Sequence, residues 1–415
     1  MKSTKLLPII VVAVSVLLNA CSGTGLSLAA PAPAAISNST TQSNGASAPA
    51  AANPQTAADI ASLQSAYEAI YQAVNPSVVT IEIGSRISGT SGQGPLGRPG
   101  NGQNNQGQVV PIAEGSGFVW DAAGHIVTNN HVVTGAARIT VTFSDGSSYG
   151  ATLVGTDPNT DLAVIQVTGA PASVLKPITM GDSTQVKVGE MVVAIGNPFG
   201  LANTMTTGIV SAIARSIQAG ITGNQNGPTN APSFSIPDVI QTDAAINPGN
   251  SGGVLVDMSG ALIGVPSQIE SQSGSNSGVG FAIPSAIVNK VVPQLISKGV
   301  AVHSFLGISG TSVTPDIVSV LNLKTGQQGV LVASVVAGGP AEKAGLKAAK
   351  VDTSGAPTAA GDIITGIDGK TITTFEDLVS YLSDSTQPGQ SVTLNVLRDG
   401  KDSQVQVTLG TQPTH

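Results

Sequence analysis

Apolar residues recur at steps of three and four positions over two stretches of the chain, which is the pattern of a helix with one buried face. The first stretch begins at Asp59, a residue type that caps helices, and ends before Pro76, because proline disfavours helical geometry in the residue that precedes it. The second begins at Ser285 and ends near Gly299, and Pro293 is expected to kink it. The pattern therefore predicts two helices with these limits.

Between the two helices the apolar segments are short, β-branched and separated by turn residues, which is typical of strands. Two long stretches, residues 84–113 and 218–237, are rich in glycine or in Gly, Asn and Pro, and they are predicted to be loops. The region as a whole predicts an all-β barrel or sandwich. The segments predicted as strands are residues 78–83, 116–120, 126–128, 139–143, 162–167, 191–195 and 254–256.

The N-terminus has the pattern of an export signal. Lys2 and Lys5 precede an apolar run over residues 6–18, which is shorter than the roughly 20 residues that a membrane span needs. Residues 18–21 (LNAC) resemble a bacterial lipobox, in which the cysteine receives the lipid, so Cys21 is the expected attachment site. The alternatives are an ordinary cleaved signal with an incidental cysteine and an uncleaved membrane anchor.

Residues 22–58 consist mostly of Ala, Ser, Thr, Pro, Gln and Asn, without a charged residue or an apolar period. Such a composition is typical of a flexible tether. We therefore expect a disordered tether between the lipoprotein-type signal, residues 1–21, and a folded region that starts at residue 59. Cys21 is the only cysteine of the chain, so a disulfide within one chain is excluded.

Length and charge narrow the class of protein further. At about 150 residues per domain, the chain corresponds to roughly two to three domains. Apolar residues make up 41% of the sequence, which permits a packed core, and the 50 glycines favour turns and β connections over helical bundles. The net charge of -7 has the wrong sign for binding a phosphate backbone. We therefore expect no nucleic acid partner.

Three residues in separate segments have the chemistry of a nucleophilic triad. Ser251 lies in the glycine-rich segment NPGNSGG, His131 follows the end of a predicted strand, and Asp161 precedes another strand. A serine hydroxyl is a weak nucleophile until an imidazole accepts its proton, and that imidazole needs a carboxylate to fix its tautomer. Asp157 and Asp243 stay open as alternative sources of the carboxylate.

The glycines beside Ser251 have their own role in this chemistry. They permit tight backbone turns, which can direct the N–H groups of Gly249 and Ser251 at one oxygen atom. We therefore predict an oxyanion hole within Gly249, Asn250 and Ser251. His125 follows a hairpin turn and is expected to be a solvated turn residue outside the site. Because no HExxH spacing or cysteine cluster occurs, we expect no metal and no cofactor.

The chain order His, Asp, Ser is the order of the two-barrel serine proteases. Four segments together resemble the HtrA/Deg family of envelope serine proteases, and the resemblance extends from about residue 60 to residue 410. The segments are residues 128–133 (TNNHVV), 157–164 (DPNTDLAV), 196–201 (GNPFGL) and 241–253 (QTDAAINPGNSGG). The resemblance implies a mainly β protease domain over residues 59–300, with two six-stranded antiparallel barrels and the site in the cleft between them.

The last part of the chain resembles a PDZ domain of the circularly permuted bacterial form, a small α+β domain over residues 301–410. Phe305, Leu306, Gly307 and Ile308 are similar to the carboxylate-binding loop of such domains. PDZ domains add a peptide strand to the edge of a sheet and receive the terminal side chain in a pocket. The resemblance also implies a helix over residues 374–382, and the insertion at residues 347–360, which has no strand period, is predicted to be a surface loop.

The resemblance implies a serine endopeptidase that is exported to the periplasm or the cell surface, held at the membrane through lipidated Cys21, and active on unfolded or damaged proteins. It also implies a homotrimer that C-terminal peptides regulate through the PDZ domain. Two other functions stay open: a non-proteolytic chaperone or peptide sensor, which the intact set of triad residues disfavours, and the hydrolysis of small esters.

Overall fold

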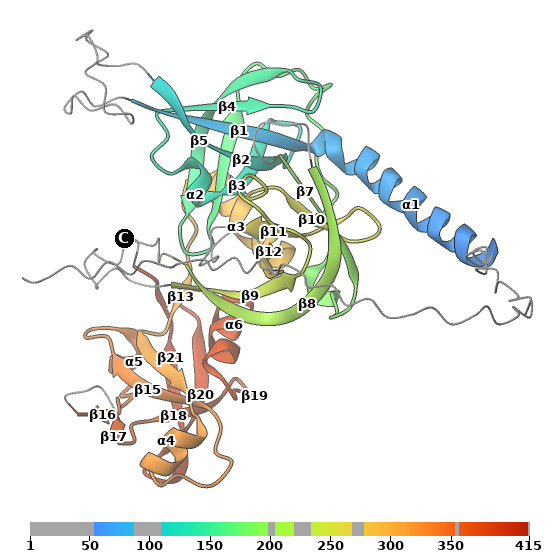
Figure 1. The fold of residues 1–415 in the computed structure, drawn as a ribbon. Helices are drawn as coiled ribbons and strands as arrows, with labels where there is room; N and C mark the ends of the chain where they lie inside the picture. Colours follow the sequence, from blue (N-terminus) through green and yellow to red (C-terminus); the bar gives the residue numbers. More distant parts are fainter. Residues whose placement is uncertain are drawn as a thin grey trace, which may run out of the picture. The chain divides into compact units, whose positions relative to one another are not determined.

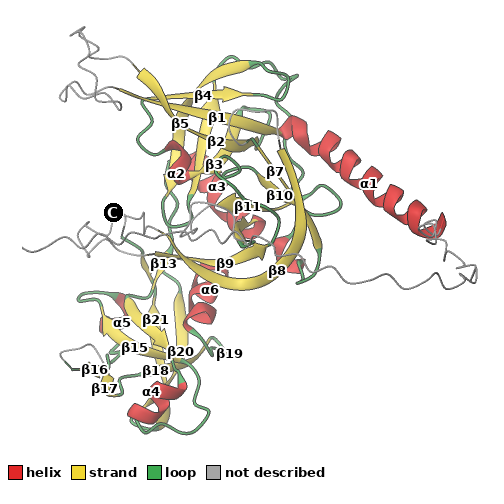
Figure 2. Ribbon diagram, in the orientation of Figure 1, coloured by secondary structure: helices red, strands yellow, loops and turns green. Residues whose placement is uncertain are grey.

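The computed structural model describes most of the chain after residue 53. Its described ranges are residues 54–86, 109–197, 204–219, 234–267, 278–352 and 357–413. The predicted signal with Cys21 and the predicted tether as far as residue 53 lie outside these ranges. Strands dominate the described part (Figure 2), which confirms the mainly β class. Among the helices of these ranges, none combines the length and the apolar character that crossing a membrane requires.

Six strands close the first barrel in the order β1-β2-β3-β6-β5-β4, and each neighbouring pair is antiparallel. The strands are β1 (Val78–Arg86), β2 (Val109–Val119), β3 (His125–Asn129), β4 (Arg138–Thr142), β5 (Ser148–Asp157) and β6 (Leu162–Val167). Ile81, Val141 and Ile165 point into the barrel and are fully buried, as expected of β-branched residues on the inner face of a sheet. β1 pairs with both β2 and β4, which closes the sheet.

The second barrel repeats this topology, because its strands follow the order β7-β8-β9-β12-β11-β10 (Figure 1). They are β7 (Met191–Gly196), β8 (Thr204–Ala219), β9 (Phe234–Thr242), β10 (Val254–Val256), β11 (Leu262–Ser267) and β12 (Gly280–Pro284). All neighbouring pairs are again antiparallel. The two six-stranded barrels implied by the resemblance are thus confirmed. The predicted loops were too long, because β2 starts at Val109 and β9 at Phe234.

An apolar core shared by the two barrels fixes their contact. Phe118 and Leu162 of the first barrel, Ile195 and Val265 of the second, and Val288 of helix α3 (Ser285–Lys298) all belong to one buried cluster with no solvent exposure. Burial of apolar surface contributes about 25 cal/mol of stability for each Å² removed from water, so this cluster stabilises the contact between the two barrels. The two barrels therefore meet at a fixed interface.

Helix α1 (Pro54–Val74) starts five residues earlier than the predicted start at residue 59. Proline is tolerated in the first turn of a helix, and the glutamine and alanines that follow are good helix formers, so the helix extends back into the predicted tether. Only the end of the helix packs against the barrels: Ile70 and Val74 are buried, whereas Ile60 is 62% exposed. The predicted end before Pro76 is confirmed, since the short 3-10 turn η1 (Asn75–Ser77) follows.

The C-terminal module has an apolar core of its own, built from residues 306–409. Its sheet follows the order β14-β15-β18-β20-β21, with β19 paired to β18, so β14 is an edge strand. β13 pairs with β22, and β16 with β17, in two separate two-stranded sheets. The strands of the module are β13 (Ser304–Phe305), β14 (Ile308–Ser312), β15 (Val330–Val335), β16 (Lys350–Val351), β17 (Pro357–Ala359), β18 (Ile363–Ile367), β19 (Lys370–Thr371), β20 (Ser391–Arg398), β21 (Lys401–Thr408) and β22 (Gly410–Thr411). β16 and β17 pair within the insertion that was predicted to be a plain loop.

Three helices accompany this sheet: α4 (Pro315–Val320), α5 (Pro340–Lys343) and α6 (Phe375–Ser385). Helix α6 begins where the sequence predicted it. Thr374 accepts a hydrogen bond from the backbone N–H of Asp377, and the Asp377 side chain accepts one from the backbone of Thr374, which forms a capping box. This reciprocal pairing satisfies two backbone donors that a helix N-terminus leaves without partners.

Candidate active site

A four-residue connection between β5 and β6 presents Asp161. Its backbone has a φ of 55°, in the left-handed region that few residues other than glycine adopt and that Asp tolerates better than most. The carbonyl oxygen of Asp161 accepts hydrogen bonds from the backbone N–H of Asn130 at 3.0 Å and from Asn129 Nδ2 at 2.9 Å. Both partners lie at the end of β3, so the turn is bound to the segment that leads into His131.

His131 lies in the short helix α2 (Asn130–Val133), directly after β3. Its ring Nδ1 lies 2.8 Å from Asp161 Oδ2, and its backbone N–H donates to Asp161 Oδ1 at 3.0 Å. When Nδ1 holds the proton toward a carboxylate, the other ring nitrogen, Nε2, is available as a proton acceptor. Asp161 is 6% exposed, whereas the His131 side chain is 44% exposed, so the imidazole reaches from a buried carboxylate toward solvent.

The alternative carboxylates have other partners. Asp157 Oδ2 lies 2.7 Å from His303 Nε2, and Asp243 Oδ1 accepts a hydrogen bond from the backbone N–H of Ile209 at 2.7 Å. The structure therefore pairs His131 with Asp161 and with neither of the two alternatives.

His125 was predicted to be a solvated turn residue, and that prediction was wrong. Its ring Nδ1 lies 2.6 Å from Asp121 Oδ2, and its side chain is only 14% exposed. The hairpin turn places the two residues four positions apart, and the same Asp121 side chain also accepts the backbone N–H groups of Ala123 and His125. This pair stabilises a turn of the first barrel and lies outside the candidate site.

A further side chain holds Asp161 from the second barrel. Ser267, the last residue of β11, donates from Oγ to Asp161 Oδ2 at 2.7 Å and is 2% exposed. No role was predicted for this residue from the sequence. The contact spans 106 positions in the chain, and a lone serine at the end of a strand gives no local signal of such a partner.

The segment before Ser251 forms a tight turn. The backbone N–H of Asn250 donates to the carbonyl of Asn247 at 3.0 Å, Pro248 is the second residue, and Gly249 is the third with a φ of 98°. Proline second and a positive φ third are the signature of a type II turn, which explains the need for glycine. The Asn250 N–H is therefore used within the turn, and the oxyanion hole stays a prediction.

The Ser251 segment is anchored to the first barrel by hydrogen bonds. Ser116 of β2 donates from its backbone N–H to the carbonyl of Ser251 at 2.9 Å and from Oγ to the carbonyl of Gly249 at 2.5 Å. Thr128 of β3 in turn donates from Oγ1 to the carbonyl of Ser116 at 2.6 Å. Ser251 itself is 4% exposed.

Gly252 shows how closely the two barrels approach here. A Cβ atom at this position would lie 2.2 Å from the carbonyl oxygen of Ser116 and 2.4 Å from Thr128 Oγ1, closer than real Cβ atoms come. The residue also has a φ of 83°. Only glycine satisfies both conditions, so the sequence SGG lets the Ser251 segment lie against Thr128 of β3, three residues before His131.

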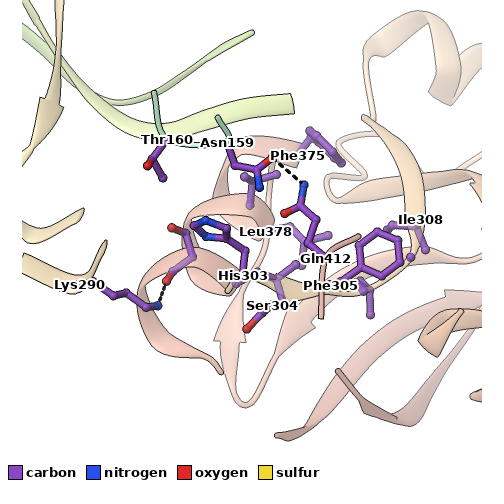
Figure 3. A pocket seen from close by; sticks show the side chains of 15 residues that line it. Asn159, Thr160, Lys290, His303, Ser304, Phe305, Ile308, Phe375, Leu378 and Gln412 are labelled. Carbon is purple, nitrogen blue, oxygen red and sulfur yellow. Dashed lines mark hydrogen bonds between the residues drawn. The ribbon is translucent and has the colours of Figure 1, made fainter. Parts of the chain in front are cut away.

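The residues predicted to bind a peptide lie beside a cavity of about 290 Å³. Phe305, Leu306, Gly307 and Ile308 form one part of its lining, and the apolar face of α6 forms another. Figure 3 labels Phe305 and Ile308 of the loop and Phe375 and Leu378 of α6. Gly307 has a φ of 80°, and its carbonyl accepts a hydrogen bond from Val336, which bends the loop back onto the sheet. The cavity therefore adjoins edge strand β14, the arrangement that strand addition by a peptide requires.

Comparisons with known proteins agree with this architecture. Residues 115–265 match the family of trypsin-like peptidase domains, and residues 304–409 match the family of PDZ domains. A solved structure entitled "HtrA-type protease AlgW with decapeptide" is 34% identical, covers 84% of this chain and 99% of that chain, and has a TM-score of 0.63.

Curated relatives with similar sequences are also named as proteases. "Protease Do-like 1, chloroplastic" from Arabidopsis thaliana is 46% identical over 304 residues, which cover 73% of this chain and 65% of that protein. "Probable periplasmic serine endoprotease DegP-like" from Brucella suis is 37% identical over 385 residues, which cover 84% of this chain and 69% of the relative. The chain thus spans about two thirds of the length of these relatives. With both matched domains and this identity, the chain belongs to the HtrA family of serine proteases.

Proposed function

We propose that this protein is a serine endopeptidase of the cell envelope that cleaves unfolded or damaged proteins. Ser251 Oγ attacks the scissile carbonyl carbon, and His131 Nε2 accepts the hydroxyl proton and later donates it to the leaving amine. Asp161 holds the imidazole in the tautomer and orientation that these proton transfers need, and it stabilises the imidazolium that forms between them.

The observation that supports this proposal best is the contact between His131 Nδ1 and Asp161 Oδ2 at 2.8 Å. The same carboxylate accepts two further hydrogen bonds, from the His131 backbone and from Ser267 Oγ, so its position is fixed from both barrels. Hydrogen bonds to a charged acceptor are worth roughly 1.5–3 kcal/mol each, which is sufficient to hold one orientation of the ring. A buried aspartate with these partners fits the role of an orienting group better than that of a turn residue.

The N–H groups of Gly249 and Ser251 are the proposed donors to the oxyanion. The type II turn at residues 247–250 and the two hydrogen bonds from Ser116 keep the backbone of this segment rigid. Donors that are already oriented need no rearrangement when the tetrahedral intermediate forms, and removing one such donor typically costs about 100- to 1000-fold in rate.

Export and attachment to a membrane through lipidated Cys21 are also part of the proposal. The Brucella suis relative and "Periplasmic pH-dependent serine endoprotease DegQ" from Escherichia coli, which is 38% identical, are named periplasmic. Incorporation of a labelled fatty acid by the full chain, and its loss in Cys21→Ser, tests whether the lipid is attached at Cys21.

We further propose a homotrimer, and sedimentation that finds only monomer at working concentrations would contradict it.

The decisive experiment compares the wild-type protein with Ser251→Ala on denatured casein. We expect complete loss of cleavage in the variant and labelling of Ser251 by a serine-directed phosphonate in the wild type. Ser259→Ala is the matched control, because Ser259 is an exposed turn serine of the same barrel. Equal behaviour of wild type and Ser251→Ala would identify a chaperone or peptide sensor instead. Turnover of small esters without peptide turnover would identify an esterase.

A further inference from the structure

Ser116 of β2 is a completely buried residue whose side chain binds two separate segments of the second barrel. Its Oγ accepts a hydrogen bond from the backbone N–H of Asn197 at 2.7 Å and donates one to the carbonyl of Gly249 at 2.5 Å. A serine hydroxyl has a single proton to donate and two lone pairs that accept. Because the Asn197 N–H is a donor, the hydroxyl proton of Ser116 is directed at Gly249.

Asn197, which supplies this N–H, is itself held by the first barrel. It directly follows the last residue of β7, and its Nδ2 donates to Thr80 Oγ1 of β1. Asn197 is 9% exposed and Thr80 is 4% exposed, so their hydrogen bond lies in a low-dielectric environment, where it is stronger than in water. The end of β7 is therefore fastened to β1, and Ser116 receives its donor from a fixed position.

Two glycines show how closely the end of β7 lies against the Ser251 segment. A Cβ atom on Gly196 would lie 2.8 Å from Asn250 Cα and 3.1 Å from Ser116 Oγ. A Cβ atom on Gly253 would lie 2.5 Å from the carbonyl oxygen of Ile195. Glycine permits both approaches because it has no Cβ. The surroundings of Ser116 Oγ are thus packed backbone, which leaves the hydroxyl little freedom to turn away from Gly249.

Ser116 holds both residues that carry the proposed oxyanion donors. Its Oγ binds the carbonyl of Gly249, and its backbone N–H binds the carbonyl of Ser251 at 2.9 Å. The N–H groups of the same two residues must lie roughly 2.7–3.1 Å from the oxyanion when it forms. The contact at Gly249 depends on the Ser116 side chain, whereas the contact at Ser251 depends on backbone alone. A substitution at Ser116 therefore releases one end of the segment and keeps the other.

We propose that Ser116 is a positioning residue for the oxyanion hole, and that Asn197, through its bond to Thr80, keeps Ser116 Oγ directed at Gly249. The inference rests on the proposed protease function and assigns a role in it to residues outside the triad. Ser116 acts on the transition state through the backbone of Gly249. Without the hydroxyl, this buried carbonyl loses its partner, and the turn shifts so that the Gly249 N–H no longer meets the oxyanion at the required distance.

Four variants of the full chain test the proposal. Ser116→Ala removes the hydroxyl, and Ser116→Cys retains a side chain of the same shape with a weaker donor. Thr80→Val removes the acceptor of the Asn197 side chain at a distance from Ser251. Ser285→Ala is the matched control, because Ser285 is also completely buried.

The control removes the same two kinds of hydrogen bond as Ser116→Ala. Ser285 Oγ accepts the backbone N–H of Ser183 at 3.0 Å and donates to the carbonyl of Gly181 at 2.9 Å. Each protein is assayed on a short internally quenched peptide, and a peptide boronic acid of matching sequence is used both to titrate active sites and to measure affinity. The boronate bound to Ser251 is tetrahedral and resembles the transition state, so its affinity reports the oxyanion hole.

We expect Ser116→Ala to lower kcat per titrated site about tenfold with KM changed less than about twofold, because the misplaced donor acts in the transition state. The affinity for the boronate should fall by about the same factor. Ser116→Cys should lie between Ser116→Ala and the wild type, and Thr80→Val should lower kcat about threefold. Ser285→Ala should keep the kcat per site and the boronate affinity of the wild type.

Wild-type kcat per site and boronate affinity in Ser116→Ala would overturn the positioning role, and a lower number of titrated sites with unchanged affinity would show a merely structural one. If Ser116→Ala does not fold, Ser116→Cys decides the same question. Wild-type kinetics of Thr80→Val would overturn the part assigned to Asn197. A wild-type protein that neither cleaves the peptide nor binds the boronate at Ser251 would contradict the protease function itself, so the two failures are distinguishable.

Discussion

Ser267 Oγ donates a hydrogen bond to Asp161 Oδ2 at 2.7 Å, from the end of a strand in one barrel to a turn in the other. The two side chains are 2% and 6% exposed. Because Asp161 Oδ2 is also the atom that faces His131 Nδ1, the serine fixes the oxygen that orients the imidazole. The candidate triad thus depends on a residue of the second barrel besides Ser251.

Ser267→Ala is expected to lower kcat about tenfold and to leave KM nearly unchanged. The variant removes one hydrogen bond to a charged acceptor, worth roughly 1.5–3 kcal/mol, and only part of that free energy serves orientation in the transition state. Steady-state kinetics on a short peptide measures both constants. Ser267→Thr retains a hydroxyl at this position and should recover most of kcat. If Ser267→Ala keeps the wild-type kcat, the hydrogen bond does not contribute to catalysis.

Gly252→Ala is expected to abolish cleavage and to lower the thermal unfolding midpoint. The new Cβ would lie 2.2 Å from the carbonyl oxygen of Ser116, so the segment of Ser251 must move away from β2 and β3. Gly169→Ala is the matched control, because Gly169 also has a positive φ, 78°, but no atom within 4 Å of an added Cβ. The left-handed backbone should cost the control only about 1–2 kcal/mol of stability, and the control should retain cleavage. Similar effects of the two substitutions would show that close approach is unimportant at Gly252.

The sequence predicted helices and strands well where a periodic apolar segment is bounded by turn or capping residues. β6 and β10 have the predicted limits. α3 ends at Lys298 and is capped by Gly299, whose φ of 77° explains the glycine. β5 and β8 gave no such pattern, because small and polar residues alternate irregularly along them. Both are paired with strands on either side, so backbone hydrogen bonds and tertiary context decide their conformation.

The site was predictable where its residues lie in motifs. His131, Asp161 and the turn at Gly249 were found because each sits in a segment whose local residues serve the same geometry. Ser267 and His303 were not assigned a role, since each contacts its aspartate over more than a hundred positions of the chain. Such pairs form only when distant segments of the chain come together in the fold. A single sequence contains no local signal of these long-range contacts.

Arg398→Met is expected to destabilise the C-terminal module by about 3–5 kcal/mol, because it leaves a buried carboxylate without its partner. Asp362 is completely buried, and Arg398 donates to both of its oxygens at 2.6 Å. The hydrogen bonds with Asp362 raise the pKa of the Arg398 guanidinium, so Arg398 keeps its positive charge.

Hydrogen exchange of the amides in β18 and β20 reports the local stability of the module in the full chain. Protection should fall about a hundredfold or more in Arg398→Met, since each 1.4 kcal/mol is a factor of ten. The double variant Asp362→Leu with Arg398→Met removes both charges and should recover much of the protection. If the single variant exchanges like the wild type, the ion pair is not a source of stability.

Asp384→Asn is expected to change how stability depends on pH. Desolvation, then the hydrogen bond and the charge of Asp238, raise the pKa of the Asp384 carboxyl to about 7, against 3.8 as its ordinary value. Between these two pH values the folded state binds more protons than the unfolded state, so this carboxyl lowers stability progressively as the pH rises. Because the Asp384 side chain keeps contact with solvent, we expect the total loss of stability over this pH range to be modest. The thermal midpoint of the wild type should therefore fall relative to that of Asp384→Asn between pH 4.5 and about 7 and then run parallel to it.

Asp402→Asn, which neutralises an exposed carboxylate of β21, is the control and should show no such change. A constant difference between the thermal midpoints of the wild type and Asp384→Asn across this pH range would contradict the raised pKa of Asp384.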